Sequence, residues 1–502
     1  MGAFYEFNEK VLTMIEIKRT NILLKPDSSR VFFRPLEFVN RERVIRVMAR
    51  VMSLSEDQVD KESAKVMERF GNRHHKLEAF FIKRYETVKD MMILDSSMSR
   101  AKQLLIGSYF CQEYSLEAAA LFNPSIVPDP DQSGLPEGAM RFIMSLRATG
   151  EGHISSLVFR SGIVHGEGRV ELMETSRYAT APEEAPDPEY CKGLFERKLH
   201  ELGLLDTFVQ NMMQSLPAQF TFQELKKTVD LTLKKNRLMH LEQQNVLQSV
   251  TALAKANYLI RFSPGQKISE RLIFPSSPSE SNGIEDARFV AFREDDGQIT
   301  YYATYTAYDG KVTFPQLIET KDFLTFKLST LNGSEVQNKG MALFPRKING
   351  HYAMISRQDG ENIFLMYSDM LHFWHDKKIL MRPTYPWEFL QLGNCGSPIE
   401  TKDGWLLLTH GVGAMRQYSI GCILLDLDNP GEIICRLPYP LITPDQTERE
   451  GYVPNVVYTC GYMEHAGHLV IPYGMSDSCV GFATVEMEDL LSELKKYPVK
   501  GK

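Results

Sequence analysis

The stretch 343–350, LFPRKING, passes through an Asn-Gly turn into a second apolar segment, Tyr352 to Arg357. Asn-Gly and Asp-Gly are favoured in two-residue hairpin loops because both central positions need a positive φ. The layout of strand, turn glycine and strand occurs four times in the C-terminal part of the chain. The turn glycines are Gly297, Gly350, Gly404 and Gly467, which are 53, 54 and 63 residues apart. A period of roughly 50 residues with several strands per unit is typical of β-propeller blades.

A fifth unit is predicted before these four. Three segments with two-residue periodicity, separated by Gly-rich turns, have the pattern of strands. They are Arg141–Leu146, Ile154–Phe159 and Arg169–Met173. We therefore expect a mainly β fold, a five-bladed β-propeller with additional helices. Because each blade contributes to a central channel, catalytic residues should be scattered along the chain.

Three regions show helical periodicity, with apolar residues at intervals of three and four. They are Asn40–Met92, Ser97–Phe122 and about Pro188–Tyr258, and a short β-like lead, Ile15–Leu24, precedes them. Three pairs have the spacing of a capping box: Ser53 with Glu56, Ser55 with Gln58, and Thr221 with Glu224. We predict a mostly helical extension over residues 1–110 and a propeller over 111–490 with a helical insertion at about 188–260. Residues 491–502 are predicted as a C-terminal tail.

The composition is ordinary for a soluble globular protein, with 43% hydrophobic and 24% charged residues among 502. The net charge is −7 and the basic residues are dispersed, so nucleic acid is not expected as a partner. Met1–Thr20 lacks the continuous apolar region of a signal peptide, and apolar stretches such as Tyr418–Leu425 are too short to span a bilayer. Seven cysteines without paired spacing predict reduced thiols and a cytoplasmic location. The sequence has no metal-binding motif, so no metal site is expected.

The motif GIEDAR at 283–288 places two carboxylates at the start of a predicted strand. Glu285 and Asp286 are adjacent, so they should point to opposite faces, and only one can enter a shared pocket. An ion-paired surface turn would explain the same residues without any function.

Basic and acidic side chains also stand at the ends of later strands. Lys339 and Arg357 lie at opposite ends of one predicted hairpin, so either could reach the channel. His410 ends an apolar strand, and Asp477 follows another. Solvated charges at a blade edge, a core or capping histidine, and a turn aspartate are the structural alternatives.

Together these segments resemble glycoside hydrolase family 130, the mannoside phosphorylases and β-mannosidases. The family pattern G-I-E-D-P-R is similar to GIEDAR, with Ala287 in place of proline. YTAY at 305–308, HGV at 410–412 and YGMSD at 473–477 follow in family order. The resemblance is strong over roughly 280–480 and weaker over 120–175, where the segments around Asn123 and Arg147 look like the family's first blade.

The resemblance implies a sugar held in the channel of a five-bladed propeller. The family's general acid matches Asp286. The residues similar to its sugar-binding set are Asn123, Arg147, Tyr305 and Asp477, and those similar to its phosphate-binding set are Lys339, Arg357 and His410. Gln391 stands near the place of a further basic residue of the phosphorylases.

Three functions are compatible with these residues. The first is an inverting phosphorylase, a glycosyltransferase-type enzyme that makes α-mannose 1-phosphate from a β-mannoside and phosphate. Asp286 would act through a sugar hydroxyl, with its pKa raised by burial beside Glu285. The second is an inverting β-mannosidase, with Glu388 or Glu400 as base. The third is a carbohydrate-binding propeller without turnover. The three basic candidates favour the phosphorylase.

The expected partners are a mannose-containing oligosaccharide and phosphate, which is the co-substrate. No further cofactor, metal, nucleic acid or membrane is expected. The helical insertion could cover the channel mouth or form a contact in a homo-oligomer, and the sequence leaves both open.

Overall fold

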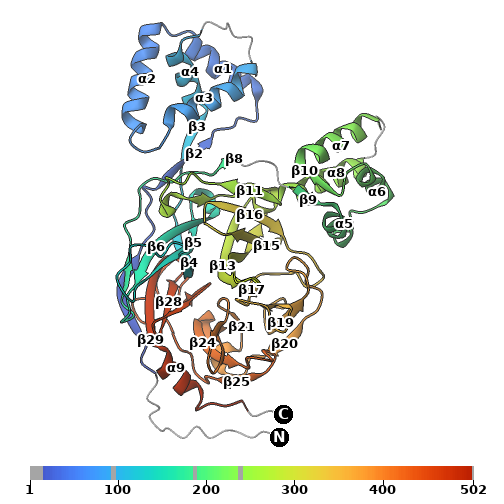
Figure 1. The fold of residues 1–502 in the computed structure, drawn as a ribbon. Coiled ribbons are helices and arrows are strands. Elements are labelled where there is room, and N and C mark those ends of the chain that lie inside the picture. The colour runs from blue at the N-terminus through green and yellow to red at the C-terminus, as the bar shows by residue number, and fades with distance from the viewer. Residues whose placement is uncertain (1–14, 92–97, 185–188, 236–240, 500–502) are drawn as a thin grey trace.

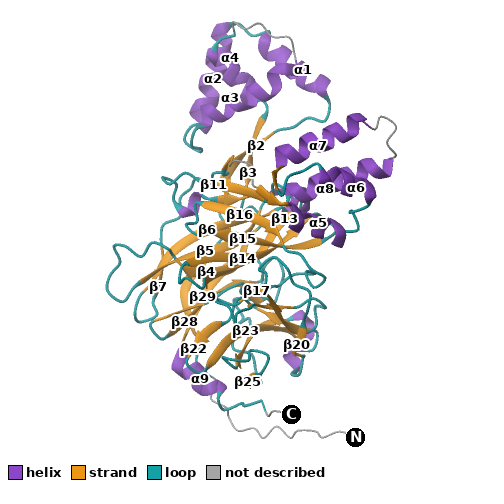
Figure 2. Ribbon diagram, turned by 45° about the vertical axis from the view of Figure 1, so that its right-hand side comes forward, coloured by secondary structure: helices purple, strands orange, loops and turns teal. Residues whose placement is uncertain are grey.

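The computed structural model describes residues 15–91, 98–184, 189–235 and 241–499 (Figure 1). The protein is mainly β, with helices in two separate regions and near the C-terminal end (Figure 2). Several predictions fall partly outside these residues: the stretch Met1–Thr20, the helix limits at Met92, Ser97 and Pro188, and the end of the predicted tail. Within the described ranges, none of the helices combines the length and hydropathy needed to cross a membrane.

Five groups of mostly antiparallel strands form the β part, and we number them along the chain. Strand group 1 contains β4 (Ala120–Pro128), β5 (Met140–Thr149), β6 (Ser155–Val164) and β7 (Val170–Leu172). Strand group 2 contains β13 (Gly283–Arg293), β14 (Ile299–Tyr308), β15 (Thr313–Thr320) and β16 (Thr325–Thr330). Strand group 3 contains β17 (Ala342–Leu343), β18 (Tyr352–Ser356), β19 (Ile363–Ser368) and β20 (Lys378–Met381).

The last two groups each have a divided first strand. Strand group 4 contains β21 (Gln391–Asn394) and β22 (Ile399–Thr401), which both pair with β23 (Gly404–Val412), then β24 (Tyr418–Leu425) and β25 (Ile433–Arg436). Strand group 5 contains β26 (Val457–Tyr458) and β27 (Met463–His465), which both pair with β28 (His468–Met475), then β29 (Cys479–Glu486) and β1 (Lys18–Leu24). The β-like lead is therefore confirmed as β1, an edge strand that pairs with the C-terminal β29.

Three of the predicted turn glycines, Gly297, Gly350 and Gly467, lie between the first and second strands of groups 2, 3 and 5, whereas Gly404 is the first residue of β23 and pairs with Thr401. Gly297, Gly350 and Gly467 have φ values of 84°, 84° and 81°. Such values favour glycine because a Cβ would crowd the backbone. The hairpin prediction is confirmed.

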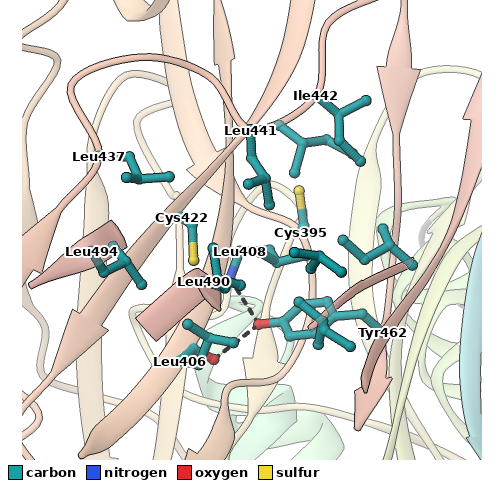
Figure 3. Packing of buried hydrophobic residues seen from close by; sticks show 14 of the residues in the cluster. Cys395, Leu406, Leu408, Cys422, Leu437, Leu441, Ile442, Tyr462, Leu490 and Leu494 are labelled. Carbon is teal, nitrogen blue, oxygen red and sulfur yellow. Dashed lines mark hydrogen bonds between the residues drawn. The ribbon is translucent and has the colours of Figure 1, made fainter. Parts of the chain in front are cut away.

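Each strand group packs on the next through a cluster of buried apolar side chains. Four clusters join groups 1 and 2, 2 and 3, 3 and 4, and 4 and 5, and a fifth joins group 5 back to group 1. Figure 3 shows the cluster between groups 4 and 5, where the Tyr462 hydroxyl accepts a hydrogen bond from the Leu408 amide at 2.8 Å. The groups follow one another around a common centre in Figure 1. Groups 1 and 2 also share one parallel residue pair, Ser155 with Gly283.

Four helices form the N-terminal helical unit: α1 (Arg41–Met52), α2 (Glu56–Phe70), α3 (Leu77–Val88) and α4 (Arg100–Ser108). The capping box of Ser55 and Gln58 is confirmed, whereas Ser53 lies at the C-cap of α1 and does not form one with Glu56. The prediction of helix up to Phe122 is wrong. Residues after α4 form β3 (Cys111–Ser115), which pairs with β2 (Val31–Pro35), and then enter β4.

The helical insertion contains α5 (Lys192–Glu201), α6 (Thr207–Gln214), α7 (Phe222–Lys235) and α8 (Leu241–Lys255). Its capping box is confirmed, because the amides of Thr221 and Glu224 bond to each other's side chains at 2.8 and 3.3 Å. Short strands flank these helices: β8 (Glu183–Glu184), β9 (Glu189–Cys191), β10 (Gln219–Thr221), β11 (Tyr258–Arg261) and β12 (Leu272–Ile273). The last helix, α9 (Met487–Leu494), packs in the cluster between groups 4 and 5, so Leu491 and Leu494 of the predicted tail are buried. The domain limits themselves stay a prediction.

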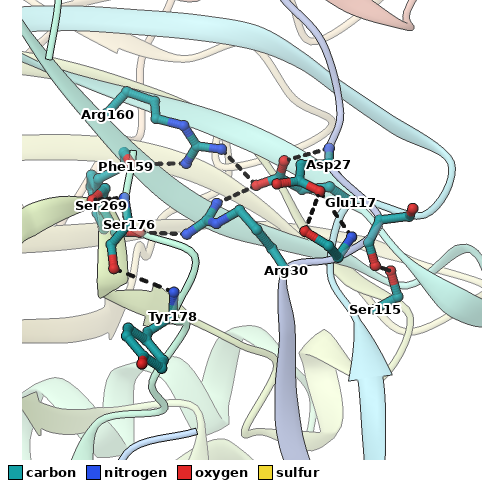
Figure 4. Close-up of polar contacts among 11 residues, drawn as sticks. Asp27, Arg30, Ser115, Glu117, Phe159, Arg160, Ser176, Tyr178 and Ser269 are labelled. Carbon is teal, nitrogen blue, oxygen red and sulfur yellow. Dashed lines mark hydrogen bonds and ion pairs between the residues drawn. The ribbon is translucent and has the colours of Figure 1, made fainter. Parts of the chain in front are cut away.

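A buried ion network ties the N-terminal part to group 1 (Figure 4). Glu117 accepts hydrogen bonds from Arg30 and Arg160, and all three side chains are buried. Arg30 also donates to the Ser269 carbonyl. Four segments distant in sequence are held together at this point.

Candidate active site

Asn123 and Asp286 occupy matching irregularities in the first strands of groups 1 and 2. The pairing of β4 with β5 shifts between Phe122 and Ser125, and that of β13 with β14 shifts between Glu285 and Arg288. Asn123 and Asp286 have φ values of 50° and 53°. A bulge of this kind re-aims the side chain of the extra residue. It explains why these two side chains meet instead of following the alternation of a regular strand.

The Asp286 carboxylate is bound directly by two neighbouring side chains. Asn123 Nδ2 donates to Asp286 Oδ1 at 2.6 Å, and Arg147 Nη1 lies 3.3 Å from the same oxygen. Arg147 Nη2 also donates to Glu285 Oε1 at 2.6 Å. The expectation that only one of the two adjacent carboxylates can face a shared group is therefore wrong, because the bulge breaks the alternation.

The pKa of Asp286 is lowered, which corrects the prediction that burial beside Glu285 raises it. Burial acts to raise this pKa, but the charges of Arg147, Lys339 and Arg288 and the Asn123 hydrogen bond outweigh it. The pKa of Glu285 is raised instead, mainly by burial. The neighbouring carboxylates therefore differ, and Asp286 is the one held ionised.

Asp477 joins this cluster from the turn between β28 and β29. Burial and the nearby Asp286 charge raise the pKa of Asp477 to about 6, against the opposing charges of Arg147, Arg416 and Lys339. Its φ of 49° is again left-handed. Three of the residues matched to sugar binding, Asn123, Arg147 and Asp477, thus surround the matched acid.

Lys339 and His410 each interact electrostatically with Asp286, and Arg357 contacts His410. The Lys339 charge lowers the pKa of Asp286, so the two groups are close. Arg357 Nη1 lies 3.4 Å from His410 Nε2, and both side chains are buried. A Cβ added at Gly393 would lie 2.4 Å from His410 Cε1 and 2.7 Å from Arg357 Cδ, so the backbone must pass close to the pair here.

His410 is not a cation in this structure. Its burial, followed by the charges of Arg357 and Arg288, holds its pKa well below the usual value. A neutral imidazole can still donate one hydrogen bond to an anion. Among the described residues, His410 Nδ1 and Arg357 Nε have no hydrogen-bond partner. The basic set is therefore two cations and one neutral donor.

Sequence reasoning missed the role of Arg288 and Tyr458. Arg288 Nη1 donates to the Asp286 carbonyl at 2.9 Å, and Nη2 donates to the Tyr458 hydroxyl at 2.6 Å. Both side chains are buried. Arg288 belongs to the GIEDAR motif, so the sequence indicated the residue itself. Its partner Tyr458 comes from group 5, 170 residues away, and could not be predicted. It positions the Asp286 backbone rather than its carboxylate.

Tyr305 is placed away from this cluster. Its hydroxyl bonds to Glu280 Oε1 and Gln316 Oε1, both at 2.7 Å, inside the packing of groups 1 and 2. Its match to a sugar-binding residue stays a prediction that these bonds do not favour. Gln391 lies on β21, opposite Val412.

The two carboxylates named as hydrolase bases are engaged elsewhere. Glu388 is buried and accepts hydrogen bonds from Arg436 and the Thr384 amide. Glu400 forms a two-point ion pair with Arg346, at 2.6 and 2.8 Å, and its side chain is 45% exposed. Neither contact joins the Asp286 cluster. Among the described residues, no three His, Cys, Asp or Glu side chains are grouped so that they could hold a metal ion.

The chain is similar to several known proteins. A family model described as beta-1,4-mannooligosaccharide phosphorylase matches residues 258–496. A 1,2-beta-oligomannan phosphorylase of Thermoanaerobacter sp. (strain X514) is 34% identical over 229 residues, 45% of this chain and 75% of the relative. A beta-1,4-mannooligosaccharide phosphorylase of Ruminococcus albus is 30% identical over 245 residues, 45% of this chain and 72% of the relative. The solved β-1,2-mannobiose phosphorylase of Listeria innocua aligns with a TM-score of 0.45 at 19% identity, covering 76% of this chain and 93% of that one.

Proposed function

The chain belongs to glycoside hydrolase family 130, and on this premise we propose that it is an inverting phosphorylase of β-mannosides. It converts a β-mannoside and phosphate into α-mannose 1-phosphate and a shortened saccharide. The names of its relatives, which are phosphorylases of β-linked mannosides, support this activity. No cofactor beyond phosphate is proposed, and a cytoplasmic location stays a prediction from the sequence.

We further propose that the five strand groups are the blades of a five-bladed propeller. The apolar clusters that link each group to the next, and group 5 back to group 1, support a closed ring. In such a ring the first strand of each blade faces the centre. This arrangement agrees with the meeting of Asn123 on β4 and Asp286 on β13.

One observation carries the functional proposal: the buried carboxylate of Asp286 lies between two kinds of residue. On one side are the residues matched to sugar binding, and on the other are those matched to phosphate binding. Asn123 and Arg147 contact it directly. The charge of Lys339 acts on it from the other set. An acid beside a cationic anion site is the minimum that a single-displacement phosphorylase requires.

In the proposed reaction, a phosphate oxygen attacks the anomeric carbon from the α face while the bond from that carbon to the leaving oxygen breaks. A proton passes from Asp286 through a hydroxyl of the bound mannose to the leaving oxygen. Lys339, Arg357 and His410 hold and orient the phosphate. Since phosphate is already nucleophilic, no carboxylate base is needed.

The lowered pKa of Asp286 requires that the complex restores its proton. Part of the lowering comes from Lys339. A phosphate anion bound beside Lys339 offsets that positive charge and favours the protonated carboxyl. Phosphate thereby helps to prepare the acid as well as attacking the sugar.

The β-mannosidase alternative has less support. Water needs a carboxylate base opposite Asp286. Glu388 and Glu400 have ion-pair partners outside the cluster, Arg436 and Arg346. A binding protein without turnover does not need an acid paired with a basic set.

The test is an assay of β-1,2- and β-1,4-mannobiose, each with and without phosphate. The proposal expects mannose 1-phosphate with at least one substrate and sugar release that depends on phosphate. Sugar release in phosphate-free buffer, at a rate that phosphate leaves unchanged, would reject the phosphorylase.

A further inference from the structure

Three strand groups carry a strained turn at the corresponding place. It lies between β5 and β6 in group 1, between β23 and β24 in group 4, and between β28 and β29 in group 5. The consecutive left-handed pairs, with their φ values, are Gly152 and His153 (68° and 59°), Met415 and Arg416 (56° and 56°), and Ser476 and Asp477 (48° and 49°). The turns of groups 1 and 4 also have the same length, and each starts at a glycine with φ and ψ near −104° and −158°. Left-handed backbone costs a non-glycine residue roughly 1–2 kcal/mol, and such strain gathers at functional sites.

The three turns lie at one end of the β part. Groups 4, 5 and 1 are consecutive, since apolar clusters join group 4 to 5 and group 5 to 1. Because neighbouring strands alternate in direction, these turns lie at the end where each first strand begins. Asn123 and Asp286 stand near the beginnings of their strands, β4 and β13. The Tyr418 amide, two residues after Arg416, donates to the Asn455 carbonyl at 3.0 Å, so the turn of group 4 lies beside the segment that carries Tyr452.

Tyr452 connects the turn of group 5 to that of group 1. Its amide donates to Ser478 Oγ at 2.7 Å, and its hydroxyl lies 3.1 Å from His153 Nδ1. The two ring centroids are 5.9 Å apart with an angle of 35° between the planes. The neighbouring Val453 amide donates to the Ser476 carbonyl at 3.0 Å, which fixes the segment on the turn.

These side chains are exposed although their backbone is held firmly. Tyr452 is 52% exposed and Met415 is 91% exposed, and His153 and Arg416 are also exposed. A tyrosine ring offers an apolar face and a polar tip, which suits the mixed surface of a sugar ring. Asp477 is half-buried, and the exposed Tyr452, His153 and Arg416 lie around it. This arrangement is that of a site which extends outward to bind further sugar units.

We propose that Tyr452, His153 and Arg416 bind the sugar unit on the leaving-group side of the scissile bond, and so contribute to the selection of the β-mannooligosaccharide. The inference rests on the proposed function, in which Asp477 contacts the transferred mannose. Tyr452 stacks on the next unit, and His153 and Arg416 donate to its hydroxyls. These residues determine specificity and take no part in the proton transfer.

The test compares Tyr452→Ala, Tyr452→Phe and the control Tyr367→Ala in the full chain. Tyr367 lies on β19 and is 37% exposed, away from the three turns. Removal of the ring should raise the KM for β-mannotriose about tenfold, with kcat and the KM for phosphate within about twofold of the parent. Tyr452→Phe keeps the ring and should recover most of the affinity, and Tyr367→Ala should behave as the parent.

Calorimetric titration with β-mannotriose separates this inference from the proposed function. A parent protein that makes no mannose 1-phosphate from any mannoside contradicts the function, yet its titration still reports on Tyr452. Weaker binding by Tyr452→Ala, with Tyr367→Ala unchanged, supports the inference. Equal affinity of Tyr452→Ala and the parent, or no binding of mannotriose by the parent, overturns it.

Discussion

At the residue scale, Asn123 and Asp286 hold left-handed backbone at facing bulges and share a hydrogen bond of 2.6 Å. Asparagine and aspartate tolerate this backbone better than other non-glycine residues. The same two residue types are also those that the site chemistry uses. The backbone requirement and the chemical requirement therefore favour the same side chains.

Replacement of Asp286 by Asn should remove the acid while leaving its size unchanged. General acid catalysis contributes roughly 10²–10⁴-fold, so kcat should fall by about that factor. Sugar affinity should stay within a few-fold of the parent, as calorimetry would measure. Asp376, which is exposed, provides the matched control, because Asp376→Asn should retain full activity. Equal rates for Asp286→Asn and the parent would remove Asp286 from the mechanism.

Replacement of Arg357 by Gln should weaken phosphate binding. Hydrogen bonds to charged groups contribute enough that the KM for phosphate should rise roughly 10–100-fold, with sugar affinity little changed. Arg346→Gln is the control. Arg346 also lies in strand group 3, between β17 and β18, but it pairs with the exposed Glu400. Initial rates over a phosphate series measure both. A similar phosphate KM in the two variants would separate Arg357 from the anion site.

Asp477 should make stability depend on pH near neutrality. Its folded-state pKa of about 6 lies above the ordinary 3.8, so its contribution to the free energy of unfolding is present below pH 4 and is lost as pH rises through 6. Asp477→Asn cannot ionise and escapes this loss. Relative to the parent, the variant should gain roughly 1–3 kcal/mol between pH 4 and pH 8.

Urea unfolding across that pH range measures the difference. Asp376→Asn, the same change at an exposed position, is the control. A difference in the free energy of unfolding between Asp477→Asn and the parent that stays constant with pH would contradict the raised pKa of Asp477.

At the element scale, β1 completes strand group 5 from the other end of the chain. Ile22 packs against the cluster between groups 5 and 1, whereas the next residue, Leu23, is 49% exposed. Successive side chains of a strand point to opposite faces, which explains the difference. The strand therefore closes the group through one face only.

Ile22→Asp and Leu23→Asp form a matched pair for this closure. A carboxylate at position 22 should lower the free energy of unfolding by roughly 1–3 kcal/mol, because apolar burial is lost and a charge enters the cluster. The same change at position 23 should have little effect. Chemical denaturation of both variants gives the comparison, and equal destabilisation would argue against the packing of β1 in group 5.

The regular hairpins could be predicted from the local sequence, whereas the bulged strands could not. The turn glycines Gly297, Gly350 and Gly467 identified hairpins because a positive φ has a strong residue preference. The bulge at Asp286 left no such signal, since its pairing partner determines it. Alternation therefore misassigned Glu285 and Asp286 to separate faces. The helix predicted up to Phe122 failed similarly, because the pairing of β3 with β2 and of β4 with β5 overrides the local pattern.

At the scale of the whole molecule, apolar clusters join each strand group to the next and group 5 to group 1. The motif residues Asn123, Arg147, Asp286 and Asp477 come from groups 1, 2 and 5, and the packing of group 1 against both of the others brings them together. The order of the motifs in the sequence identified these four residues. It could not give the pKa direction of Asp286, because Arg147 and Lys339 reach it from other groups. The exposed Tyr452 belongs to no sequence motif, and only its contacts in the structure indicate a role for it.

The most direct test of the central claim is to follow β-mannobiose and phosphate with the protein by proton and phosphorus NMR during the first turnovers. A single displacement assisted by Asp286 predicts that the first sugar phosphate is the α anomer and that mannose appears in equal amount. First formation of the β anomer, or of free mannose alone at a rate that phosphate does not change, would contradict the account.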